Sequence, residues 1–205
     1  MRTAQDNYAL DRAFVLIEGH PKSTRCYSAV AIFMKKIRYG VAMSLDGYIA
    51  GPKGEADWIV HDPEVNFAEI WAQYDMGLMG RGTYAPAVAR LGKNAFQGMK
   101  VVVVSRTMRH EDHPEITVIN ELTRERVRAL RDEAKKDIWL FGGGSLFRSM
   151  LELGEVDGID VSVMPVVLGG GVRFLPTPAG EAKLTLAKHR TYKSGIVSLS
   201  YEVLR

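Results

Sequence analysis

The stretch Ile138-Trp-Leu-Phe-Gly-Gly-Gly-Ser145 decides the fold class, because three glycines join an apolar strand to a helix. Residues 138–141 are typical of a short buried strand, and residues 145–153 have the apolar spacing of a helix. A glycine turn at the carboxyl end of a parallel strand lets phosphates approach the backbone, and the helix N-terminus attracts the anion. The alternative is a tight turn with positive φ angles, but one glycine suffices for that. We therefore predict an anion or dinucleotide site at Gly142, Gly143, Gly144 and Ser145.

Two further strand ends carry groups that suit a phosphate. The motif Gly80-Arg-Gly-Thr83 opens a predicted helix after a short apolar strand, so Arg81 offers a charged donor and Thr83 a helix cap. Ser105 and Arg106 directly follow a run of four valines, which predicts a buried strand. Ligands of α/β proteins bind beyond the carboxyl ends of strands, so three such ends indicate one shared site. The spacing matches neither a Walker loop nor the Rossmann fingerprint.

Strands and helices alternate from residue 37 onward. Predicted strands cover residues 37–43, 76–79, 101–104, 116–119, 138–141 and 159–168. Predicted helices run from Pro63 to Tyr74, from Leu122 to Ala134 and from Ser145 to Leu153. A further helix is predicted to begin after the Gly80 turn, with Pro86 in its first turn, where proline is tolerated. Residues 183–192 and 196–204 flank a short turn, which favours an antiparallel hairpin. The sequence predicts an α/β domain with a mixed, mostly parallel sheet flanked by helices and closed by this hairpin at one edge.

The loop at residues 43–51 leaves the first strand and contains Asp46 between flanking glycines. Such a loop can close over a ligand, and its carboxylate is a candidate for acid–base catalysis. The alternative is a turn residue whose carboxylate accepts hydrogen bonds from backbone amides. The five histidines do not cluster with carboxylates, and there is no nucleophile elbow. We therefore predict no metal site and expect a cofactor to supply the reactive group.

Charge and cysteine content limit the partners and the compartment. The chain has 205 residues, with 27 Lys and Arg against 24 Asp and Glu, a net charge of +3. Residues 1–36 hold six basic and three acidic residues, so residues 37–205 hold 21 of each and are neutral. This balance does not favour nucleic acid, and no apolar run is long enough for a membrane span. Because Cys26 is the only cysteine, we expect a reducing, cytoplasmic compartment.

The domain organisation follows from the same pattern. Residues 1–36 lack the regular alternation and carry the excess charge, so we expect a poorly ordered N-terminal extension there. Residues 37–205 are predicted to form the folded domain, which is long enough to bury a core without disulfides or metals.

These motifs together resemble the dihydrofolate reductase superfamily. The branch they resemble most holds the reductase (C-terminal) domain of the bifunctional riboflavin-biosynthesis deaminase–reductase. The resemblance runs from about residue 37 to residue 204 and implies a dihydrofolate-reductase-like three-layer fold. It rests on residues 43–50, Trp58 and the motifs at residues 80–84, 105–107, 142–147 and 165–171. The motifs are specific for the superfamily but not for a substrate.

The resemblance implies that the domain binds NADPH. Ala42 would bind the nicotinamide carboxamide through its backbone, and Ile49 would pack beside the ring. The phosphates would be surrounded by Gly80, Arg81 and Thr83, and the pyrophosphate held by Gly142, Gly143, Gly144 and Ser145. Ser105 and Arg106 would meet the 2′-phosphate of the adenosine, which favours NADPH over NADH.

The substrate side is less specific. Typical dihydrofolate reductases carry an acidic residue on the first helix that binds the pterin and assists protonation. Glu64 and Glu69 are the candidates here, Asp57 and Asp62 are alternatives, and each can instead be a surface or capping group. The reaction implied is hydride transfer to a small nitrogen heterocycle, with a carboxylate or a bound water supplying the proton.

Several functions stay open at this point. The first candidate substrate is 5-amino-6-(5-phosphoribosylamino)uracil, as in riboflavin biosynthesis, and the second is dihydrofolate. The deaminase domain of the bifunctional enzyme is absent from this sequence. From other classes, the alternatives are a non-catalytic NADPH-binding module and a nucleic-acid binder. The family is compatible with a homodimer, although no feature of the sequence indicates one.

Overall fold

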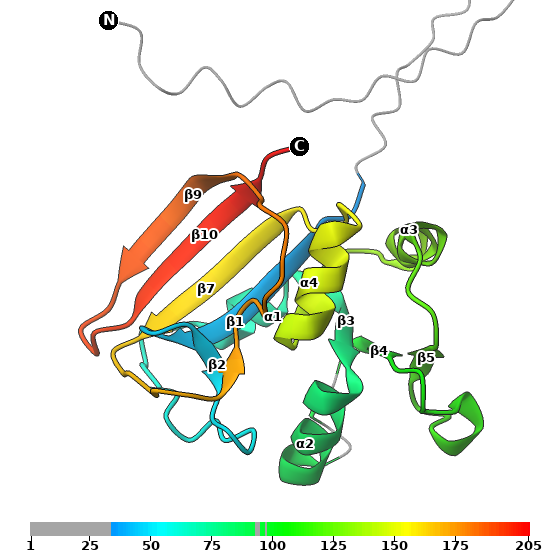
Figure 1. Cartoon of the computed structure of the whole chain (residues 1–205), viewed down its shortest axis with the longest axis horizontal. Helices are drawn as coiled ribbons and strands as arrows, with labels where there is room; N and C mark the ends of the chain where they lie inside the picture. The colour runs from blue at the N-terminus through cyan, green and yellow to red at the C-terminus, as the bar shows by residue number, and fades with distance from the viewer. Residues whose placement is uncertain (1–33, 93–94, 97) are drawn as a thin grey trace, which may run out of the picture. The chain divides into compact units, whose positions relative to one another are not determined.

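An eight-stranded sheet with strand order β5-β4-β3-β6-β1-β7-β10-β9 forms the centre of the domain (Figure 1). This computed structural model describes residues 34–92, 95–96 and 98–205. Cys26 and all but the last three residues of the predicted extension lie outside the described residues. Among the helices of the described residues, none is both long and apolar enough to cross a bilayer.

The strands and helices alternate along the chain as follows. The strands are β1 (Ile37–Ser44), β2 (Tyr48–Ala50), β3 (Tyr74–Gly80), β4 (Lys100–Val104), β5 (Thr117–Ile119), β6 (Asp137–Gly142), β7 (Gly158–Met164), β8 (Val172–Arg173), β9 (Leu184–Thr191) and β10 (Val197–Val203). The helices are α1 (Phe67–Trp71), α2 (Arg81–Leu91), α3 (Arg124–Glu133) and α4 (Gly144–Glu152), with a 3-10 turn at His110–Asp112.

The pairing of the strands confirms the predicted fold class. The neighbours β5-β4, β4-β3, β3-β6, β6-β1 and β1-β7 are parallel. Strand β10 is antiparallel to both β7 and β9, so the C-terminal hairpin closes one edge of the sheet. Strands β2 and β8 form a separate antiparallel ribbon. The sheet is therefore mixed and mostly parallel, as the sequence predicted.

Helices cover both faces of the sheet. Side chains alternate along each strand, so the apolar side chains of β6 point to both faces and are buried by helices on each. On one face, Ile138 and Leu140 of β6 pack in a core with residues of α3 and α4, including Val127 and Phe147. On the other face, the rings of Trp139 and Phe141 contact Trp71 of α1. Figure 1 shows α4 in front of the sheet and α1 behind it. The carboxyl ends of the parallel strands meet at one edge, where the sequence placed the ligand site.

Four local predictions were wrong. The first helix does not reach Tyr74, because this residue is buried and begins β3. Pro86 lies beyond the first turn of α2, because the helix begins at Arg81, immediately after β3. Thr83 lies inside that helix and makes no capping hydrogen bond. The strand predicted to run to residue 168 ends at Met164, because Pro165 has no amide hydrogen for the ladder.

Candidate cofactor site

The glycine turn between β6 and α4 lies against the two other elements that the sequence assigned to the ligand. A Cβ atom built on Gly143 would lie 3.7 Å from Ile49 Cδ1 and 3.7 Å from Thr83 Oγ1. The structure thus brings β2, the first turn of α2 and the glycine turn together. These contacts join three of the sequence-predicted cofactor residues.

Packing within the chain explains why two of the three glycines lack a side chain. Gly142 has a φ of +84°, and a Cβ there would lie 2.8 Å from Tyr39 Cε2. A Cβ on Gly144 would collide with the backbone carbonyls of Arg173 and Phe174. The peptide bond between Gly142 and Gly143 is cis. Gly143 alone has room for a Cβ, and this room adjoins Ile49 and Thr83.

Two helix N-termini without side-chain caps meet at this turn. Gly80 and Gly143 are the N-caps of α2 and α4, and neither helix has a side-chain cap or an acidic residue in its first turn. Unpaired amides and the helix dipole favour an anion at such positions. Ser145 follows in the first turn of α4 and is exposed. The arrangement therefore fits the diphosphate of a dinucleotide.

The turn after β4 brings Ser105 and Arg106 close to α2. Arg81 Nη1 donates to Thr107 Oγ1 over 3.1 Å, which joins the two strand ends. Ser105 is buried, and its hydroxyl accepts hydrogen bonds from the amides of Thr107 (3.3 Å) and Met108 (3.2 Å). Arg106 is exposed beside it. The serine thus shapes the turn, while the arginine is available to an anion at this edge.

Ala42 lies near the carboxyl end of β1, half-buried and paired in register with Ser162 of β7. Its side chain shares a face with Gly40, the face that Trp139 covers, because both positions have the same parity along β1. The predicted role of its backbone toward a nicotinamide stays a prediction.

Asp46 is a hydrogen-bond acceptor that joins two loops. Its carboxylate accepts from Ser44 Oγ (2.7 Å) and from the amides of Leu168 (3.0 Å) and Gly169 (2.7 Å). The hydrogen bond from Ser44, followed by those from the two amides, lowers the pKa of Asp46 to about 2. The group is therefore ionised at neutral pH, which argues against proton donation and favours the turn-residue alternative.

The carboxylates next to α1 differ in their surroundings. Glu64 is exposed and pairs with Arg190 Nη2 over 3.2 Å, and Glu69 is exposed in the first turn of α1. Asp62 is buried, and its carboxylate accepts from the amides of Glu64 (2.8 Å) and Ser194 (3.3 Å). Hydrogen bonds from Ser194 and from the amide of Glu64 lower the pKa of Asp62. In the described part of the chain, the hydrogen bond of Glu64 goes to Arg190 and that of the Glu69 amide to Asn66, both away from the glycine turn, so their catalytic roles stay predictions.

Sequence reasoning missed two parts of this site. One is Tyr39, whose ring lies under Gly142 and stacks on Phe147 with centroids 3.9 Å apart. The other is the segment at Arg173 and Phe174 that packs against Gly144. Nothing in the sequence distinguishes Tyr39 from the other residues of a buried strand. The glycines at residues 169–171 could have indicated that the backbone there approaches another segment closely.

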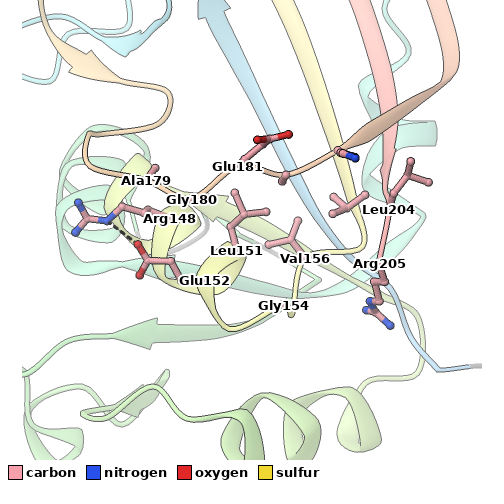
Figure 2. A pocket seen from close by; sticks show the side chains of 13 residues that line it. Arg148, Leu151, Glu152, Gly154, Val156, Ala179, Gly180, Glu181, Leu204 and Arg205 are labelled. Carbon is pink, nitrogen blue, oxygen red and sulfur yellow. Dashed lines mark ion pairs between the residues drawn. The ribbon is translucent and has the colours of Figure 1, made fainter.

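Two hollows lie outside the glycine turn. Figure 2 shows a cavity of about 730 Å³ between α4, residues 179–183 and residues 203–205. It adjoins the start of β7, at the opposite edge from the glycine turn, and contains none of the predicted site residues. A second hollow, of about 370 Å³, is lined by Phe67, Ala68, Trp71 and Ala72 on α1. In the described part of the chain, no three His, Cys, Asp or Glu side chains gather as a metal site.

Two known proteins are similar to this chain in sequence. The chain is 34% identical over 178 residues to the uncharacterized protein YyaP of Bacillus subtilis, covering 82% of this chain and 94% of that protein. It is 31% identical to the riboflavin biosynthesis protein RibD of Mycobacterium tuberculosis over 66% of this chain, and spans 44% of that longer protein.

Solved structures show the same fold. A protein of Shewanella sp. PV-4 assigned to riboflavin biosynthesis has a TM-score of 0.73 at 22% identity, over 84% of this chain and 100% of that chain. A dihydrofolate reductase from Enterococcus faecalis has a TM-score of 0.61 at 14% identity, over 84% of this chain and 99% of that chain. The dihydrofolate-reductase-like fold is therefore confirmed. A model of the family described as the RibD C-terminal domain matches residues 35–198, so the chain belongs to the RibD C-terminal domain family.

Proposed function

We propose that this domain is a reductase that binds NADPH and reduces a small nitrogen heterocycle. The observation that carries the proposal is the meeting of two uncapped helix N-termini at Gly143, beside Arg81 and close to Arg106. Family membership supports a pyrimidine-reductase-like reaction. The first candidate substrate is 5-amino-6-(5-phosphoribosylamino)uracil, which the description of a Thermotoga maritima structure of the same fold names.

The residues of the chain would hold and orient the cofactor. The amides at the starts of α2 and α4 would bind the diphosphate, and Ile49 would pack against the nicotinamide near Gly143. A bound nicotinamide would supply the hydride. Close packing at Gly142 and Gly144 makes this part of the site rigid, which favours a fixed reacting distance.

The substrate would lie on the face of the sheet that carries Phe141. This ring directly precedes the glycine turn, and Trp71 of α1 contacts it edge-on with centroids 6.1 Å apart. Aromatic side chains suit a flat heterocycle. Because Asp46 and Asp62 have lowered pKa values, we assign proton delivery to water rather than to either carboxylate.

A cofactor titration is the first test. Adding NADPH to the full chain should quench protein fluorescence with saturation at micromolar cofactor, and no binding would overturn the proposal. If NADPH binds, its oxidation is then measured with the phosphoribosylamino-uracil and with dihydrofolate in parallel. Turnover of dihydrofolate alone would favour the second candidate, and turnover of neither would favour a non-catalytic NADPH-binding module.

Arg106 provides a sharper test of the preference for NADPH. The Arg106→Ala variant should weaken NADPH by about tenfold or more while leaving NADH unchanged, because a charge-assisted hydrogen bond to the 2′-phosphate would be lost. Dissociation constants for both nucleotides check this result. Arg109→Ala, another exposed arginine in the same loop region, is the matched control. Equal losses for NADPH and NADH would reject a role in 2′-phosphate recognition.

We also propose that the domain forms a homodimer. Sedimentation equilibrium of the full chain with and without NADPH tests this proposal. A dimer should give twice the monomer molar mass under both conditions.

A further inference from the structure

One carboxylate joins the two loops that flank the glycine turn. Asp46 lies between β1 and β2, and its partners Leu168 and Gly169 lie between β7 and β8. Ser44 Oγ completes the junction, because it also accepts a hydrogen bond from the amide of Tyr48 over 3.0 Å. The amide of Leu45 donates to the carbonyl of Val166 over 2.8 Å beside it. The two loops are thus held together by both side-chain and backbone hydrogen bonds.

Each of the two loops leads directly into a segment that contacts the turn. After Asp46 the chain enters β2, where Ile49 Cδ1 lies 3.7 Å from the position of a Cβ on Gly143. After Gly169 the chain enters β8, and the carbonyls of Arg173 and Phe174 lie against Gly144. The amide of Phe174 donates to the carbonyl of Gly47 over 2.9 Å, which closes the arrangement.

The opposite end of the proposed cofactor site is held independently of this junction. Arg81 bonds to Thr107 at the ends of β3 and β4. Asn120 Nδ2 donates to the carbonyl of Ser105 over 2.7 Å and fixes the turn that carries Arg106. Neither hydrogen bond involves Asp46 or the two loops that it joins.

We propose that Asp46 is a positioning residue, which holds Ile49 and the segment at Arg173 and Phe174 against the glycine turn and so builds the nicotinamide end of the site. The inference rests on the proposed function. It replaces the predicted catalytic role of this carboxylate, whose oxygens are already used by three donors. The adenosine end should then bind its half of the cofactor without help from Asp46.

The test compares the whole cofactor with its adenosine half. Calorimetric titrations use NADPH and adenosine 2′,5′-bisphosphate, which lacks the nicotinamide. Asp46→Asn should weaken NADPH binding by about tenfold, since the negative charge and one of the two oxygens that accept from the Leu168 and Gly169 amides are lost. The affinity for the bisphosphate should stay unchanged within about twofold. Asp132→Asn makes the same chemical change on the exposed side of α3 and should alter neither affinity.

A second variant keeps the inference testable if Asp46→Asn does not fold, as judged by circular dichroism. Ser44→Ala removes one donor to Asp46 and keeps the carboxylate, so it should show a smaller loss in the same direction. Equal losses for both ligands, or no loss for either, would overturn the positioning role. Failure of the unaltered protein to bind NADPH would instead overturn the proposed function and this inference with it.

Discussion

Tyr39 shows how a single buried group can be understood from its surroundings. Its side chain is fully buried between Phe147 and Phe174, and within the described residues its hydroxyl has no hydrogen-bond partner. Burial also raises the pKa of this hydroxyl, so it stays neutral. An unpaired buried hydroxyl has lost its hydrogen bonds to water without replacement, which is unfavourable for folding.

We therefore expect Tyr39→Phe to raise the free energy of unfolding by about 1 kcal/mol, because the ring contacts remain and the desolvated hydroxyl is removed. Urea denaturation of both proteins measures the difference. Tyr84→Phe is the matched control, since the hydroxyl of Tyr84 donates to Glu115 over 3.0 Å and its removal should give no gain. A clear loss of stability in Tyr39→Phe would mean that an ordered water or a ligand atom pairs with the hydroxyl.

Residue types predicted which strand ends come together, but not what each residue contacts there. The glycine run was predicted to let a ligand approach the backbone, but the lack of side chains at Gly142 and Gly144 is explained by contacts inside the chain. Those contacts join segments that lie far apart in the sequence, so no local pattern contains them. The role of Asp46 also depends on distant contacts, because its partners Leu168 and Gly169 follow it by more than 120 residues.

The aromatic face of β6 depends on glycines in the neighbouring strands. Trp139 Nε1 donates to the carbonyl of Gly40 over 2.9 Å, and its ring stacks on Phe141 with centroids 4.5 Å apart. Tyr74 and Trp71 enclose the same indole. A Cβ on Gly40 would lie 2.6 Å from Trp139 Nε1. The indole has ring neighbours on several sides, so it cannot move away without losing contacts.

Gly40→Ala should therefore destabilise the domain by about 1–3 kcal/mol, as overpacking of a filled core does. Thermal unfolding followed by tryptophan fluorescence would report both the lower stability and the displaced indole. Gly82→Ala offers the contrast, because nothing lies within 4 Å of a Cβ there and alanine favours a helix. If both variants unfold at the temperature of the unaltered protein, the indole is not fixed by Gly40.

Periodic elements were predictable, and short ones were not. The strands with continuous apolar runs and the helix α3 lie close to their predicted bounds. In these elements the spacing of the apolar residues shows which positions are buried in the sheet or along one side of the helix. The ribbon of β2 and β8 was missed, because strands of three and two residues exist only through each other and through the loops around Asp46. The length of α1 was also overestimated for this reason, since only tertiary contacts decide that Tyr74 belongs to β3.

At the scale of the whole domain, one buried arginine connects the residues before β1 with the residues before β7. Arg131 of α3 is 4% exposed, and its guanidinium donates to the carbonyl of Lys35, to Asp157 Oδ2 (2.5 Å) and to Glu155 Oε2 (3.2 Å). Asp157 also accepts from the amide of Ile37 over 2.8 Å and pairs with Arg205. The start of β1, the approach to β7 and the C-terminal Arg205 therefore meet around Arg131 and Asp157.

Removing Arg131 should cost more than removing any surface charge, because it leaves the buried Glu155 without its cation and Asp157 with only the exposed Arg205. Arg131→Ala is expected to lower the free energy of unfolding by about 3–5 kcal/mol, the usual cost of breaking a buried ion pair from one side. Arg128→Ala, on the exposed side of the same helix, should change it by less than about 0.5 kcal/mol. Urea denaturation at neutral pH measures both variants. A loss in Arg131→Ala no larger than in Arg128→Ala would show that the hydrophobic core alone holds the start of β1 and the approach to β7 in place.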